Sequence, residues 1–205
     1  MPFYDYYGDW SATSVGKGWV RAQTRYVLDR LMRALPSASS LLEIGPGRGA
    51  FADACRQKHL QYCALDINAR LLRGLSRRGH RGVLARATHM PCASETFDIV
   101  FASHVIEHSP GYSEALTFLE EMRRVVKCGG LVVIIAPDYL ALREDFWNCG
   151  YSHSFVTTRR RLRQIYHDAE LTIIDDRSLY GPLIGLTGWV AGQTLGGVFW
   201  DRLPG

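Results

Sequence analysis

Apolar residues in this chain fall into short runs that alternate with helical patterns. The runs predict strands over 40–44, 62–66, 82–86, 97–103, 131–136 and 171–175. Apolar positions at helical spacing predict helices over 21–35, 50–58, 69–78, 112–126 and 157–169. Several strands are apolar throughout, as in 131–136, which is typical of strands buried on both faces. The pattern predicts an α/β fold: a mostly parallel, twisted sheet with helices on both faces.

Length and composition place the chain among ordinary globular proteins. Its 205 residues suffice for one domain with a core, and 47% hydrophobic and 21% charged residues are typical values. A net charge of +4 is too small to indicate an anionic partner. The cysteines are odd in number and form no CxxC pair, which argues against a disulfide framework and a zinc site. We therefore predict no metal site and a reducing, cytoplasmic setting, and the first residues show no secretory signal.

Both ends of the chain differ from the regular middle. Residues 1–35 combine an aromatic-rich arm with a predicted helix, and we expect them to form a lid, with Tyr7, Trp10 and Trp19 as candidates to contact substrate. Residues 1–178 would then form one catalytic domain. Residues 179–205 would form an apolar, glycine-rich C-terminal segment.

Residues 179–200 carry no charge and approach the ~20 residues that span a bilayer. Their glycines, Pro182 and polar residues weaken the case for a span. Three interpretations stay open: a buried hairpin or lid over an apolar substrate, peripheral contact with the inner face of a membrane, and a true span.

A glycine-rich loop follows the first predicted strand. The run from Glu43 to Gly49 reads EIGPGRG and leads into a predicted helix. Closely spaced glycines let the backbone pass under a ligand, and unpaired amides at a helix start attract polar or anionic atoms. The loop therefore predicts a nucleotide site. It also fits the dinucleotide pattern GxGxxG/A, with Asp66 at a suitable distance, so the loop alone leaves NAD open.

Four motifs that follow one another along the chain help to decide which nucleotide cofactor the loop binds. EIGPGRG is followed by CALDIN, by ATHMPCASETFDIVFASHVIEH and by FLEEMRRVVKCGGLVVIIAP. From about 41 to 175 the chain resembles class I S-adenosylmethionine-dependent methyltransferases, in particular the small-molecule group related to the ubiquinone and menaquinone methyltransferases. The resemblance implies a Rossmann-like sheet, S-adenosylmethionine as cofactor and methyl transfer as the activity.

The resemblance also implies the cofactor-binding residues. Asp66 can accept the ribose hydroxyls, although an Asp here can also cap a helix. Ile67 is placed to pack on the adenine face or in the core. Glu43 is a buried acid that needs donors from the loop or from the ligand. Arg86 stands where the family often has Asp. Without that acid, we expect the backbone groups of the next residues, Ala87 and Thr88, to bind the adenine. The full predicted set is Glu43, Gly45, Pro46, Gly47, Gly49, Asp66, Ile67, Ala87, Thr88, Ser103 and His104.

Catalytic candidates gather after the fourth predicted strand, where strand ends face the ligand crevice. The activated methyl group needs only an aligned nucleophile and, for some acceptors, proton removal. His108 is a candidate general base with His104 beside it, while a capping role for His108 stays open. His153 is a further substrate-site candidate, in a segment that either closes over substrate or precedes a helix cap at Thr157 or Thr158.

The acceptor is less well defined than the cofactor. Ser103–His104–Val105–Ile106 stands where base-methylating relatives carry Asn/Asp-Pro-Pro-Tyr, and the arginine clusters are spread over three helices, so we expect no nucleic-acid partner. We predict a small, hydrophobic or lipid-linked acceptor. The alternatives are a methyltransferase-like scaffold without turnover, suggested by Arg86, and an NAD-dependent oxidoreductase.

Overall fold

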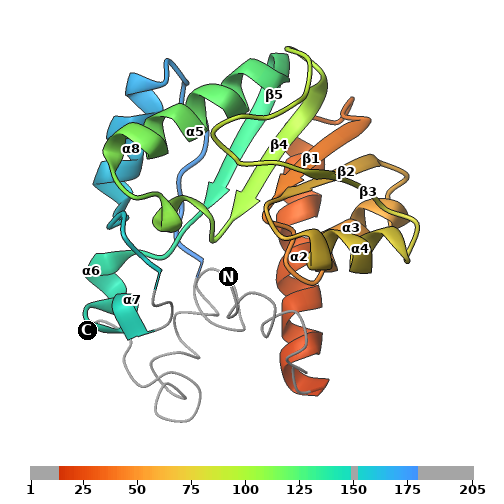
Figure 1. The fold of residues 1–205 in the computed structure, drawn as a ribbon, viewed down its shortest axis with the longest axis horizontal. Helices are drawn as coiled ribbons and strands as arrows, with labels where there is room; N and C mark the ends of the chain where they lie inside the picture. Colours follow the sequence, from red (N-terminus) through yellow and green to blue (C-terminus); the bar gives the residue numbers. More distant parts are fainter. Residues whose placement is uncertain (1–13, 149–151, 180–205) are drawn as a thin grey trace.

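The computed structural model describes residues 14–148 and 152–179 of the chain. Five parallel strands form one sheet in the order β3-β2-β1-β4-β5 (Figure 1). The strands are β1 (Ser40–Ile44), β2 (Gln61–Asp66), β3 (Arg81–Leu84), β4 (Phe97–Ser103) and β5 (Val126–Ile135). In this order β1 lies between β2 and β4, so the loops that follow these three strands emerge side by side.

Helices cover both faces of the sheet, as predicted (Figure 1). The described helices are α2 (Ser14–Ala34), α3 (Ala50–Gln57), α4 (Ala69–Ser76), η1 (Ile106–His108), α5 (Tyr112–Val125), α6 (Tyr139–Leu142), α7 (Asp145–Asn148) and α8 (Arg159–Asp168). One face packs on α2, α3 and α4, and the other packs on α5 and α8. The short helices α6 and α7 lie beyond the carboxyl end of β5 in Figure 1.

Alternation along β1 supplies both core layers. Leu41 belongs to the cluster that packs against Leu28 and Phe51, whereas Leu42 belongs to the cluster around Phe118. All five residues of β1 are buried, as expected for a central parallel strand. Burial on both faces fixes the register of β1 and with it the position of the loop at its end.

Three predicted boundaries were wrong. Residues 171–175 form no strand in the structure. The predicted strand 131–136 begins earlier, at Val126, and Gly129 adopts a positive φ within it. The predicted helix 21–35 begins earlier, at Ser14, so Trp19 lies within α2.

Two other predicted segments are only partly described. Tyr7 and Trp10 lie outside the described residues, as do residues 180–205. Within the described part of the N-terminal segment, α2 buries Val27, Leu28 and Leu31 beside α3. Among the described helices, none has the length and apolar character needed to cross a membrane.

Candidate active site

The glycine loop has the backbone shape that its sequence predicts. Gly45, Gly47 and Gly49 all have positive φ, at 68°, 51° and 74°. A Cβ on Gly45 would stand 2.6 Å from Cγ2 of Val105, whereas a Cβ on Gly47 would meet nothing within 4 Å. Gly45 therefore lets β1 and the loop after β4 approach closely, and Gly47 leaves open space beside the backbone. Pro46 is buried between them.

Glu43 is buried one residue before the end of β1. The Tyr62 hydroxyl of β2 donates to Oε2 of Glu43 at 2.5 Å, a donor that the sequence pattern does not indicate. Burial raises the pKa of Glu43 to about 8, against the lowering effect of this hydrogen bond. Burial and the neighbouring carboxylate also raise the pKa of Tyr62, which therefore remains a donor. Glu43 therefore lies next to the glycine loop, and its burial favours the uncharged form of its carboxyl group.

Asp66 is the last residue of β2. The helix-capping role that was the alternative for Asp66 belongs to another residue. Asn68 caps α4 and accepts from the amides of Arg70 and Leu71. Asp66 Oδ1 accepts from the Asn68 amide at 2.7 Å, which fixes the carboxylate at the end of the strand. Burial raises the pKa of Asp66, against the hydrogen bonds from the Asn68 and Ile67 amides. A carboxylate held in this way can accept the paired hydroxyls of a ribose.

Ile67, the next residue, is 62% exposed. The core-packing alternative for this side chain was therefore wrong. An exposed branched side chain next to a fixed carboxylate suits a role under a flat, apolar ligand face such as adenine.

Ala87 and Thr88 lie beyond β3 in partly buried positions. The turn that holds them is closed by the His89 amide, which donates to the Arg86 carbonyl at 3.0 Å. Arg86 itself is exposed. Backbone groups of this turn can hold an adenine edge without the acid that the family often carries.

The loop after β4 brings two predicted residues to the same sheet edge. Ser103 ends the strand, and His104 has a positive φ of 56°, a strained value for a residue with a side chain. The His104 amide donates to the Ile135 carbonyl of β5, which holds the turn in place. The His104 side chain is 61% exposed, with Nδ1 3.2 Å from Oε1 of Glu107. It is therefore accessible to a small molecule at the strand ends.

His108 and His153 meet behind this turn. The amides of Ser154 and Phe155 donate to the Glu107 carbonyl, which holds the segment before α8 against η1. The two imidazole centroids are 5.0 Å apart. Nδ1 of His108 lies 2.9 Å from the Ser152 hydroxyl, and burial lowers the pKa of His108 more than the neighbouring Glu107 carboxylate raises it.

The cap of α8 is Thr158, whose side chain accepts from the Arg161 amide. Thr157 instead donates to the Pro137 carbonyl at 2.5 Å. His153 is buried and is not the capping residue. Its position beside η1 therefore comes from the docking of its segment.

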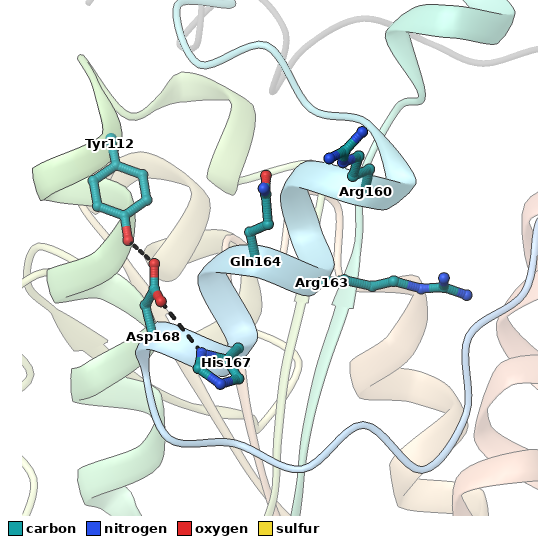
Figure 2. Close-up of a pocket in the computed structure, with 6 residues that line it drawn as sticks. All are labelled: Tyr112, Arg160, Arg163, Gln164, His167 and Asp168. Atoms are coloured by element: carbon teal, nitrogen blue, oxygen red, sulfur yellow. Dashed lines mark hydrogen bonds and ion pairs between the residues drawn. The ribbon is translucent and has the colours of Figure 1, made fainter.

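Away from these loops, the surface has a shallow hollow between the start of α5 and α8. Tyr112, Arg160, Arg163, Gln164, His167 and Asp168 line it, and the Tyr112 hydroxyl donates to Asp168 (Figure 2). None of the predicted site residues lines this hollow. The arginine clusters are residues 77–78, 123–124 and 159–161. Each contains an arginine that makes an ion pair: Arg78 with Asp53, Arg124 with Glu121, and Arg159 with Asp176.

The comparisons with known proteins agree with this geometry. Residues 42–134 match the model of a family described as a methyltransferase domain. A protein of Mycobacterium sp. (strain JLS) named as an uncharacterized methyltransferase is 28% identical over 134 residues, which cover 64% of this chain and 48% of that protein. A second, of Mycobacterium tuberculosis (strain ATCC 25177 / H37Ra), is 36% identical over 103 residues, 48% of this chain and 39% of its own length. The chain thus spans about half or less of these relatives.

Solved structures show the same fold. A SAM dependent methyltransferase from Archaeoglobus fulgidus superposes with a TM-score of 0.63 at 18% identity, covering 87% of this chain and 89% of that one. The SAM-bound amino pentose methyltransferase CalS10 from Micromonospora echinaspora gives 0.54 at 21% identity, covering 65% and 54%. These matches do not single out the ubiquinone and menaquinone group. The parallel sheet and the glycine loop agree with the match of residues 42–134 to a methyltransferase domain, and the chain shares its fold with solved S-adenosylmethionine-dependent methyltransferases.

Proposed function

We propose that this chain transfers the methyl group of S-adenosylmethionine to a small organic acceptor, and that the acceptor is hydrophobic or lipid-linked. The observation that carries the proposal is the convergence of three loops at one sheet edge. Because β2, β1 and β4 are neighbours, the loops after Asp66, Ile44 and Ser103 share that edge. In open parallel sheets this edge holds the ligand.

In this proposal the cofactor lies across the glycine loop. Asp66 accepts the ribose hydroxyls, Ile67 packs on adenine, and the backbone of Ala87 and Thr88 holds the adenine edge. Gly45, Pro46, Gly47 and Gly49 shape the loop under the methionine half, with Glu43 behind it and Ser103 and His104 at the methyl end. The sulfonium supplies an activated methyl group, so the protein's task is alignment.

Exposed apolar side chains support the hydrophobic acceptor. Leu140 on α6 is 62% exposed and Trp147 on α7 is 44% exposed, and these helices lie beyond the end of β5 (Figure 1). Trp147 packs edge-on against Phe146 and Tyr139, so the aromatic group is built into the fold. The uncharged sequence of residues 179–200 points to the same acceptor class.

Of the two predicted bases, His104 is better placed to touch an acceptor. Its imidazole is mostly exposed at the strand end, whereas His108 is half-buried against Ser152 and His153. We therefore assign proton removal, where the acceptor needs it, to His104.

Methyl-labelled S-adenosylmethionine tests the proposal directly. The protein is incubated with labelled cofactor and with organic-phase and aqueous extracts supplied separately as acceptors. Label transferred into the organic-phase pool is expected, with a several-fold slower rate for His104→Ala. Label only in aqueous acceptors would overturn the hydrophobic assignment. Cofactor binding without label in any pool would favour the scaffold alternative.

A further inference from the structure

The carboxylate of Glu107 is the least satisfied buried group in the described part of the chain. Its side chain is 0% exposed, and both oxygens lack a hydrogen-bond partner. His104 Nδ1 comes within 3.2 Å of Oε1 but does not complete a hydrogen bond. Burying a carboxylate without hydrogen-bond donors or a positive partner is strongly unfavourable. A bound cation would stabilise a buried carboxylate of this kind.

Two imidazoles flank this carboxylate. One ligand atom from each of Glu107, His108 and His153 lies within 4.8 Å of the others. Nε2 of His153 faces Oε1 of Glu107 at 4.0 Å. Ligand atoms around one ion at about 2.1 Å lie roughly 3–3.5 Å apart, so small side-chain rotations would close the set.

The outer contacts of both imidazoles match those of metal ligands. Nδ1 of His153 lies 2.6 Å from the Phe146 carbonyl, an acceptor that places the ring proton on Nδ1. Nδ1 of His108 lies beside the hydroxyl and the carbonyl of Ser152. Imidazoles that ligate metals through Nε2 characteristically donate Nδ1–H to a carbonyl in this way. The backbone bonds from Ser154 and Phe155 to Glu107 then hold the ligand-bearing segments together.

From this arrangement we infer that Glu107, His108 and His153 form a binding site for one divalent transition-metal ion. Two imidazole nitrogens and one carboxylate oxygen suit Zn²⁺, Co²⁺ or Mn²⁺ and do not suit Mg²⁺ or Ca²⁺, which prefer oxygen ligands. The prediction of no metal site rested on cysteine spacing, which does not register a site built from imidazoles and a carboxylate. Three protein ligands leave a position for a further ligand.

The site lies in the loop directly after β4, next to His104. An ion there would act as a Lewis acid beside the acceptor position, where it can bind an acceptor oxygen and promote its deprotonation. This consequence rests on the proposed methyl transfer, whereas the metal site itself does not.

The test uses tag-free, chelator-treated protein without cofactor or acceptor. Calorimetry with Zn²⁺ and the visible spectrum of Co²⁺ are expected to show one ion per chain with nitrogen and oxygen ligation. Glu107→Gln, His108→Gln and His153→Gln should each weaken binding at least tenfold. His167→Gln is the control, because its exposed imidazole lies outside the cluster.

Thermal unfolding without metal identifies any variant that fails to fold, and the wild-type Co²⁺ spectrum decides the question if all three fail. The inference is overturned by absence of a stoichiometric site for Zn²⁺ and Co²⁺, by a thiolate charge-transfer band, or by folded variants that bind as the wild type does. Since neither cofactor nor acceptor is present, failure here is distinguishable from failure of methyl transfer.

Discussion

The hydroxyl of Tyr62 donates a 2.5 Å hydrogen bond to the carboxyl of Glu43 inside the sheet core. The two residues come from neighbouring strands, and both side chains are less than 10% exposed. The pair stands directly behind the glycine loop. It therefore links the stability of the fold to the shape of the proposed cofactor site.

Removing this donor tests the link. Tyr62→Phe leaves the Glu43 carboxyl without its Tyr62 hydrogen bond, and we expect a loss of about 1–3 kcal/mol in the free energy of unfolding. Urea denaturation at pH 7 measures it. Tyr112→Phe is the control, because that hydroxyl is on the surface and its loss should leave the free energy of unfolding nearly unchanged. Equal effects in the two variants would contradict the assigned role.

The raised pKa of Glu43 predicts a pH dependence of stability. With a pKa of about 8 in the folded chain and an ordinary value of 4.5, the folded chain keeps a proton that the unfolded chain releases. Stability from this group is therefore complete below pH 4.5, falls as the pH rises toward 8, and levels off above it. The full loss amounts to roughly 3–5 kcal/mol at most.

Glu43→Gln keeps an acceptor for Tyr62 and has no titrating proton. The difference in unfolding free energy between wild type and variant should therefore shift in favour of the variant between pH 5 and pH 8.5. Denaturant titrations of both proteins at these two pH values measure the shift. A difference independent of pH would show that Glu43 is charged, with an ordinary pKa, in the folded chain.

Exposed Ile67 should matter for the cofactor and little for the fold. Ile67→Ala is expected to change stability by less than about 0.5 kcal/mol and to weaken S-adenosylhomocysteine binding several-fold, because the adenine loses an apolar contact. Ile174→Ala is the matched control, since Ile174 is 71% exposed and lies outside the predicted site. Calorimetry on the three proteins compares them, and equal affinities would remove Ile67 from the site.

Two glycines should respond to alanine in opposite directions. Gly45→Ala forces a Cβ against Val105 at φ 68°, and we expect a loss of about 2 kcal/mol or more. Gly74 lies inside α4, where an added Cβ would meet nothing within 4 Å, so Gly74→Ala should stabilise by about 0.5–1 kcal/mol. Melting temperatures give both signs, and a stabilised Gly45→Ala would contradict the loop geometry.

The central sheet could be predicted well because continuous apolar strands leave few alternatives. Residues 171–175 show where that reasoning fails. Their short apolar run is strand-like, but a strand also needs a neighbouring strand to pair with its backbone. In the structure, side chains hold this segment: Arg30 pairs with Asp175, and Arg163 pairs with Asp176. Such pairing between distant segments leaves no periodic signal in a sequence.

The candidate site divides in the same way. Glycine spacing predicted the loop after β1, and the predicted strand ends placed Asp66 and His104 at the same edge of the sheet. The burial of Glu107 and its approach to His153 depend on how the segment before α8 docks on η1, which no local pattern records. Tyr62 could not be predicted as a donor, because an alternating strand position indicates burial without indicating the partner.

Titration of the protein with S-adenosylhomocysteine in a calorimeter tests the central claim most directly. One site per chain is predicted, with affinity at least tenfold weaker in Asp66→Ala and unchanged in Asp29→Ala, whose carboxylate pairs with Lys58 on the surface. Absence of binding to the wild-type protein, or an Asp66→Ala variant that binds as tightly, would contradict the account.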